Sequence, residues 1–283
     1  MSFFSCSSGK PKQVVALSFD NQPIHYNIYG RGPLTLVFVH GWATNQTYWD
    51  SQVKFFSDKY RIVTLDLVGH GASGKARQNW TPENYARDVI AVIDEIEAEN
   101  LVLIGHDMGD EIILRASRTK SEKLAGIIGV DNFKNVDVLD TDSLQKAEDR
   151  FFNIMKKNFK IGAEFYVAEY LFSPFSNPAT IKKVIDDVTK VNPKMATETL
   201  KHLFKDYKND KQFLRNIIAP LYLVNSDYVP TDTIALKKHC RRGFEITYIK
   251  DIGHFPMLEA PSELNDALAK YLTRIEKRVK SKD

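Results

Sequence analysis

The stretch LVLIGHDMG, at residues 101–109, carries the strongest structural signal in the chain. Its apolar beginning predicts a short buried strand, and a helical pattern starts at Met108. Gly105 and Gly109 each lie two residues from Asp107. A strand that turns sharply into a helix leaves no room for side chains at those two positions. The spacing therefore predicts a tight strand–helix turn with Asp107 at its strained centre.

Strands and helices alternate on both sides of this turn. Residues 13–19 and 23–29 predict a strand pair, and apolar runs predict further strands at 34–39, 61–67, 124–130, 220–224 and 244–249. Helical patterns occur at 46–57, 82–96, 108–118, 231–239 and 261–276. This order predicts an α/β fold with a doubly wound, mostly parallel sheet.

The alternation stops between residues 132 and 215, where helical segments rich in Phe, Tyr and Lys replace strands. An insertion between paired strands has to lie over an edge of the sheet. At the carboxyl edge it would cover the crevice in which such sheets bind ligands. We therefore predict a core at 13–131 and 216–276, an inserted helical lid at 132–215, and flexible termini at 1–12 and 277–283.

Several polar positions follow predicted strands. His40, Gly41 and Trp42 follow the strand at 34–39, and the backbone N–H groups of Trp42 and Met108 are predicted to form a two-donor oxyanion hole. His254 follows the last strand, and Asp227, just past the strand at 221–224, is predicted to orient it. Asp131, past the strand at 124–130, is a second candidate acid, and Asp227 is preferred because its spacing from the strand is better.

Together these segments resemble the α/β-hydrolase fold superfamily. The matching pieces are His40-Gly41, residues 66–73, the turn at 105–109, Asp227 and residues 253–259. The resemblance implies a triad of Asp107, Asp227 and His254, in which the turn around Asp107 is the nucleophile elbow. Most members have serine at its centre, and an aspartate there resembles epoxide hydrolases and haloalkane or haloacetate dehalogenases.

The chemistry of a carboxylate explains this substitution. A carboxylate is ionised at neutral pH, is favoured by a helix N-terminus, and suits displacement at a saturated carbon. The product is an alkyl ester of Asp107, which a water activated by His254 would hydrolyse. Attack on an ordinary ester would instead give an anhydride. The expected activity is therefore epoxide hydrolysis first and carbon–halogen hydrolysis second, and esterase activity is not expected.

The resemblance also implies substrate-binding residues. These are His40, His106 and the lid tyrosines Tyr166 and Tyr170, with Tyr207 as a further lid tyrosine. Lid tyrosines protonate the epoxide oxygen in epoxide hydrolases. The dehalogenases usually carry tryptophan or arginine after the nucleophile, where this chain has Met108, and the indole of Trp42 is a candidate halide donor. Epoxide hydrolases usually have proline at the position of Ala43.

Two alternatives remain open at this point. One is a serine-type scaffold whose elbow serine has been replaced by aspartate, with weak or no esterase activity. Asp110, one helical turn from Asp107, favours it, because like-charge repulsion would raise the pKa of the nucleophile. The other is a non-catalytic, ligand-binding member of the fold.

Composition limits the remaining classes. The 283 residues include 39 Lys plus Arg and 36 Asp plus Glu, a net charge of +3 that gives no nucleic-acid footprint. No apolar run reaches the length of a membrane span. The seven His and two Cys show no chelating spacing, and no phosphate loop follows the first strand. We expect no metal or cofactor, a small-molecule substrate, and a monomer or homodimer.

The two cysteines, Cys6 and Cys240, predict a reducing, cytoplasmic location. The residues around Cys6 resemble the end of a bacterial lipoprotein signal, which leaves a periplasmic lipoprotein as the alternative.

Overall fold

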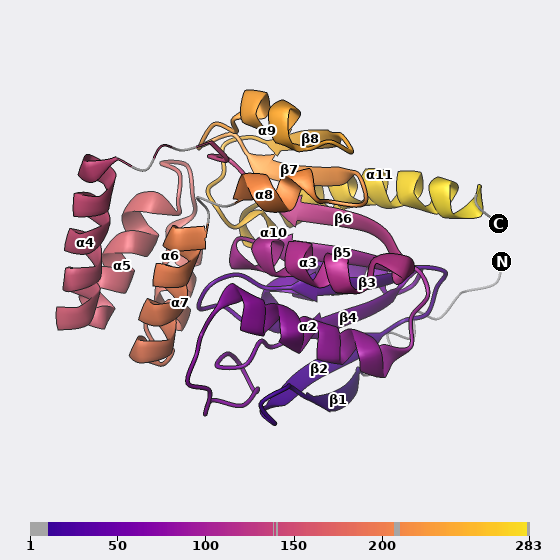
Figure 1. Cartoon of the computed structure of the whole chain (residues 1–283), viewed down its shortest axis with the longest axis horizontal. Helices are drawn as coiled ribbons and strands as arrows, with labels where there is room; N and C mark the ends of the chain where they lie inside the picture. The colour runs from indigo at the N-terminus through magenta and orange to yellow at the C-terminus, as the bar shows by residue number, and fades with distance from the viewer. Residues whose placement is uncertain (1–10, 138, 140, 207–209, 282–283) are drawn as a thin grey trace.

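The computed structural model describes residues 11–137, 139, 141–206 and 210–281. Its centre is an eight-stranded sheet in the order β1-β2-β4-β3-β5-β6-β7-β8 (Figure 1). The strands are β1 (Lys12–Leu17), β2 (Pro23–Tyr29), β3 (Thr35–Val39), β4 (Arg61–Leu65), β5 (Leu101–His106), β6 (Leu124–Val130), β7 (Leu221–Ser226) and β8 (Phe244–Ile249). β2 runs antiparallel to both β1 and β4. The other strands, β4, β3, β5, β6, β7 and β8 in sheet order, are parallel to one another. The predicted α/β fold with a mostly parallel sheet is confirmed.

Helices cover both faces of this sheet. Figure 1 shows α2 (Pro82–Ile96) and α3 (Met108–Thr119) side by side in front of it and α11 (Pro261–Lys280) behind it. The shorter core helices are α1 (Asp50–Phe56), α8 (Asp210–Arg215), α9 (Thr233–His239) and α10 (Pro256–Glu259), and the 3-10 turns are η1 (Gln46–Trp49) and η2 (Ser121–Lys123). Of these, α1 contacts α11. The central strands β3 and β5 are buried along their whole length, as their continuous apolar sequences predict.

The last helix is longer than the sequence pattern predicts. α11 continues to Lys280, whereas the core was predicted to end at residue 276. Ile275 is fully buried, and Val279, one turn later, packs against the core, so the apolar stripe continues past the predicted boundary.

Of the five described helices between β6 and β7 in the sequence, the first four form a group beside one end of the sheet (Figure 1). They are α4 (Asp142–Lys157), α5 (Phe159–Tyr170), α6 (Pro178–Val188) and α7 (Pro193–Asp206). Two hydrogen bonds fasten α7 to the core: the indole N–H of Trp42 donates to the carbonyl of Ala196 at 2.9 Å, and the hydroxyls of Tyr85 and Thr199 are 3.0 Å apart. Within the described residues, no helix is long and apolar enough to cross a membrane.

Candidate active site

The turn between β5 and α3 has the strained geometry that the glycine spacing predicts. Asp107 has φ 52° and ψ −122°, a conformation that non-glycine residues rarely adopt. A Cβ atom on Gly105 would lie 2.5 Å from the backbone of Gly109, and one on Gly109 would lie 2.5 Å from the carbonyl oxygen of Val39. Only glycine fits at either position, and the turn presents Asp107 at the carboxyl edge of the sheet.

The two carboxylate oxygens of Asp107 have different surroundings. Oδ2 accepts a 2.9 Å hydrogen bond from the backbone N–H of Trp42, which follows β3. Oδ1 lies 3.5 Å from Nε2 of His254. Met108 begins α3, where the first backbone N–H groups have no partner within the helix. Of the two N–H groups predicted to hold an oxyanion, that of Trp42 thus contacts Oδ2.

His254 lies on the loop after β8, between two carboxylates. Its Nε2 faces Asp107, and its Nδ1–H donates to Oδ2 of Asp131 at 2.7 Å. The backbone N–H of His254 donates to the carbonyl of Leu171, just after α5. Glu259 accepts from the N–H groups of Gly253 and Phe255 on either side of the histidine, at 3.0 and 3.1 Å. These contacts fix the loop and therefore the direction of the imidazole.

The prediction that Asp227 orients His254 is wrong. Asp227 is exposed, and its Oδ1 accepts from the backbone N–H of Asp251 at 3.2 Å. Asp107, Asp131 and Asp227 directly follow β5, β6 and β7, respectively. β6 is the neighbour of β5, whereas β7 is two strands away, about 10 Å at the usual strand spacing. One imidazole therefore spans Asp107 and Asp131, the acid that the sequence pattern ranked second.

Hydrogen-bond donors surround the Asp131 carboxylate. Besides His254, the backbone N–H of Ser226 donates to Oδ1 at 2.6 Å, and Nζ of Lys134 lies 2.8 Å from the same oxygen. Burial raises the pKa of this carboxyl, but the hydrogen bonds and charges of His254 and Lys134 bring it well below its usual range. Lys134 was not singled out from the sequence, although its place three residues after Asp131 was visible there.

His254 and Asp107 also favour each other's charged form. Burial lowers the pKa of His254, but the carboxylates of Asp107 and Asp131 raise it to about 9. Burial raises the pKa of Asp107, but His254 and the N–H of Trp42 lower it to about 2. At neutral pH the resting centre is therefore an imidazolium held between two carboxylates.

Asp110 is the third buried carboxyl of this region. Among the described residues, none makes a hydrogen bond to either of its side-chain oxygens. Burial, and then the charge of Asp107, raise its pKa well above the usual value. The repulsion that the sequence predicts thus raises the pKa of Asp110, behind the elbow, whereas the pKa of Asp107 is lowered.

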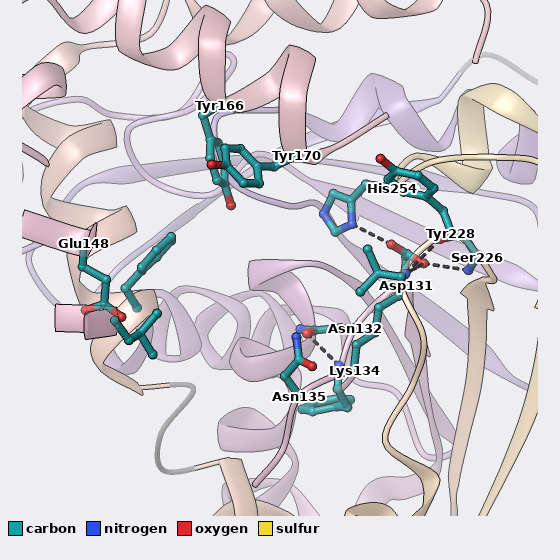
Figure 2. A pocket seen from close by; sticks show the side chains of 14 residues that line it. Asp131, Asn132, Lys134, Asn135, Glu148, Tyr166, Tyr170, Ser226, Tyr228 and His254 are labelled. Atoms are coloured by element: carbon teal, nitrogen blue, oxygen red, sulfur yellow. Dashed lines mark hydrogen bonds and ion pairs between the residues drawn. The ribbon is translucent and has the colours of Figure 1, made fainter. Parts of the chain in front are cut away.

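A cavity of about 380 Å³ opens beside His254 and Asp131. Figure 2 shows Tyr166 and Tyr170 of α5 on one side of it, and Asp131 and Lys134 on another. Its wall includes residues of three of the inserted helices: Leu144 and Glu148 of α4, Tyr166 and Tyr170 of α5, and Phe204 of α7. Tyr207 lies outside the described residues.

The two predicted substrate-binding histidines do not line this cavity. His40 is 1% exposed, and its Nε2 accepts from the backbone N–H of Leu67 at 3.1 Å. His106 is 2% exposed, and its Nε2–H donates to the carbonyl of His254 at 2.7 Å. Each ring lies at the end of a strand and forms a hydrogen bond with a backbone group of another segment, so both histidines stabilise the loops of the site rather than line the cavity.

The indole of Trp42 is not available to a halide. Its N–H is the donor to Ala196 in α7, and the side chain is buried. The halide donor that the sequence suggests is therefore already engaged within the fold. Within the described part of the chain, no group of three His, Cys, Asp or Glu residues is placed to hold a metal ion.

Comparisons with known proteins agree with this architecture. Residues 36–267 match the model of the alpha/beta hydrolase family. Karrikin insensitive 2 receptor CA of Petunia hybrida is 22% identical over 260 residues, which are 87% of this chain and 94% of the receptor. An esterase of Thermogutta terrifontis has a TM-score of 0.78 at 19% identity, over 93% of this chain and 99% of the esterase. The epoxide hydrolase CorEH has a TM-score of 0.72 at 16% identity, over 94% and 100%. Because the family model covers most of the chain, this protein belongs to the alpha/beta hydrolase family.

Proposed function

We propose that this protein is a hydrolase with Asp107 as its nucleophile, that it works through a covalent alkyl ester, and that its substrates are epoxides. The observation that carries the proposal is that the two oxygens of the Asp107 carboxylate have different partners. Oδ2 occupies the donor site at the Trp42 N–H, and Oδ1 faces His254. A serine hydrolase needs that donor site for the oxygen of its substrate, whereas an alkylated aspartate brings its own carbonyl oxygen to it.

In the first step, Oδ1 of Asp107 attacks an epoxide carbon, the carbon–oxygen bond of the ring breaks, and an alkoxide forms. Tyr166 or Tyr170 gives its phenolic proton to this oxygen. Burial and the charge of Asp107 raise the pKa of Tyr166, so the phenol is protonated when the substrate arrives. Tyr166 and Tyr170 lie one helical turn apart with ring centroids 5.9 Å from each other, so both can reach one substrate oxygen.

The second step depends on the change in charge at Asp107. The ester is neutral, so His254 loses one of its two carboxylate partners and its pKa falls. Its proton replaces the one that the tyrosine gave away. The neutral imidazole then takes a proton from water, and the hydroxide attacks the ester carbonyl. The N–H groups of Trp42 and Met108 hold the oxyanion, and Asp131 stabilises the imidazolium. When the acyl–oxygen bond breaks, the departing alkoxide takes the proton of the newly added hydroxyl, so a diol leaves and Asp107 is ionised again.

The inserted helices have a role in this scheme as a lid. They supply five residues of the cavity wall, Leu144, Glu148, Tyr166, Tyr170 and Phe204, while the segments that follow β6 and β8 supply Asp131, Lys134 and His254. Carbon–halogen hydrolysis is the second candidate, since the same attack would displace a halide. It has less support because the Trp42 indole is occupied.

A single turnover in water enriched in oxygen-18 tests the mechanism. An aryl-substituted epoxide is mixed with excess enzyme, and the peptide that contains Asp107 is weighed by mass spectrometry. We expect label in the Asp107 carboxylate of the wild type and no turnover by Asp107→Asn, whereas Asp227→Asn, the matched exposed aspartate, reacts like the wild type. Turnover that leaves Asp107 unlabelled would rule out the ester intermediate.

A substrate panel separates the reaction classes. It contains epoxides, haloalkanes, haloacetate and p-nitrophenyl esters. Turnover of epoxides supports the proposal, and turnover of organohalides alone selects the second candidate. Turnover of neither, with esterase activity gained by Asp107→Ser, would indicate a serine-type scaffold with a replaced nucleophile. Tight binding without turnover would indicate a ligand-binding member of the fold.

A further inference from the structure

Lys134 is the least expected group near the triad. Its side chain is 11% exposed, and Nζ lies 2.8 Å from Oδ1 of Asp131 and 2.9 Å from Oγ of Ser226 at the end of β7. The backbone carbonyl of Lys134 accepts from the N–H of Asp232 at 2.8 Å. Both the backbone and the ammonium are thus fixed to the segment that begins with β7, and Figure 2 shows the side chain at the cavity wall.

The contacts divide the Asp131 carboxylate between two tasks. Oδ2 accepts from Nδ1–H of His254, while Oδ1 accepts from the N–H of Ser226 and from the ammonium of Lys134. A carboxylate with donors on one oxygen cannot rotate freely about its Cβ–Cγ bond, so its other oxygen keeps its direction. Such an arrangement fixes the plane in which the imidazole lies.

We propose that Lys134 is a positioning residue of this centre: its ammonium holds Asp131 in the orientation that directs His254 and balances the second negative charge beside the imidazole. The catalytic consequence of this role rests on the proposed function, whereas the structural role does not.

The charges around His254 show why a second cation matters. Asp107 and Asp131 are the adjacent anions, while burial shifts the pKa values of Asp110, His106 and Tyr166 in the direction that favours their neutral forms. Burial and the charge of His254 lower the pKa of His106 to about 4. The other titratable groups at the cavity wall are Glu148, Tyr170 and Tyr228. Lys134 and His254 together balance the two anions. Without Lys134, the imidazolium would face an excess of negative charge and release its proton less readily.

The test compares three variants by the titration of the His254 ring in histidine-labelled NMR spectra, with the His254 signal assigned by its loss in His254→Gln. Lys134→Gln removes the charge and keeps a hydrogen-bond donor, Lys134→Met removes both, and Lys134→Arg keeps both. Lys238→Met is the matched control, because Nζ of Lys238 also lies 2.8 Å from an aspartate oxygen, on Asp137, and its side chain is 62% exposed.

We expect Lys134→Gln to raise the pKa of His254 by about one unit, a size that fits a charge a few ångströms away in a partly screened site. Lys134→Arg and Lys238→Met should leave it unchanged. In the ester intermediate the lost cation would also hold the proton on His254 more firmly, so the neutral fraction of the base, and with it kcat at pH 7, should fall by up to about tenfold, with KM less affected. Lys134→Met should lose more kcat than Lys134→Gln, because it also releases the Asp131 carboxylate.

Two results would overturn the proposal. One is a His254 titration that does not change in Lys134→Gln. The other is an equal shift in Lys134→Arg, because then the charge is not the cause. If Lys134→Met fails to fold, the comparison of the Gln and Arg variants still decides the question. If no substrate of the panel is turned over, the proposed function fails, yet the titration still tests the role of Lys134.

Discussion

Asp107 and Asp110 lie three residues apart at the start of α3, yet their surroundings shift the pKa values of the two carboxyl groups in opposite directions. Asp107 receives the N–H of Trp42 on one oxygen and faces His254 with the other. Asp110, fully buried behind it, has no hydrogen bond to its carboxyl oxygens within the described residues. Asp131 is also buried, yet its pKa is lowered like that of Asp107, because three donors surround its carboxylate.

The difference shows that burial does not decide the charge of a carboxyl in this fold. Desolvation opposes ionisation at all three positions, and only donors and a nearby cation overcome it. The carboxyl edge of the sheet supplies these donors from strand ends, whereas the helix interior behind the elbow does not.

The largest expected effect follows from removing the charge of Asp107. Asp107→Asn keeps the shape of the side chain but cannot form the alkyl ester, so kcat on epoxides should fall roughly 10³-fold or more. Steady-state kinetics with the purified variant measures this. Because amide side chains can hydrolyse to aspartate, mass spectrometry has to confirm the asparagine in the assayed sample. Activity within tenfold of the wild type would contradict the assignment.

The next effect distinguishes the two candidate acids. Asp131→Asn takes the anionic acceptor from Nδ1 of His254, and we expect kcat to fall roughly 10²-fold or more. Asp227→Asn removes an exposed carboxylate that accepts a hydrogen bond from the backbone N–H of Asp251, and kcat should stay within twofold. A larger loss in Asp227→Asn than in Asp131→Asn would reverse the assignment of the acid.

The pH dependence of stability tests the ionised pair itself. The pKa of His254 is raised to about 9 from an unfolded value near 6.5, so its stabilising contribution is complete below about pH 6.5 and is lost as pH rises towards 9. The Asp107 pKa is lowered to about 2, so its contribution is present above pH 4 and is lost towards pH 2. The free energy of unfolding of the wild type minus that of His254→Gln should decrease by about 1–3 kcal/mol between pH 6 and 9.5. A difference that stays flat across this range would mean that His254 is not held as an imidazolium.

The smallest expected effect lies at Asp110. Its pKa is raised on folding, so the native state keeps a proton that the unfolded chain has released above pH 4, and stability falls as pH rises. Asp110→Asn removes this titration, and we expect it to raise stability at pH 8 by about 1 kcal/mol, or roughly 2–4 °C in Tm. Thermal unfolding at pH 4 and pH 8 checks the sign. A gain at pH 4 that equals the gain at pH 8 would show that the titration of Asp110 is not the cause.

Local patterns were sufficient to predict the sheet and the elbow. The apolar runs gave the strands to within a few residues, and the glycines at 105 and 109 indicated the strained turn, because both signals depend on contacts between near neighbours in sequence. His254 was also predicted, since the loop after the last parallel strand lies at the carboxyl edge of the sheet. The end of α11 was placed too early, because the basic residues after 276 hid its apolar stripe.

What the sequence by itself determined is therefore the fold, the elbow with Asp107, and a histidine opposite it. Only the tertiary structure decided which partners these groups have. Asp131 and Asp227 both follow buried strands, and the order of β5, β6 and β7 in the sheet puts Asp131 beside His254. Long-range packing also buries His40 and His106. It places the Trp42 indole N–H against a carbonyl of α7 and the Lys134 ammonium against Asp131. Hydrogen bonds between distant segments depend on where strands and helices meet in space, which no short stretch of the chain records.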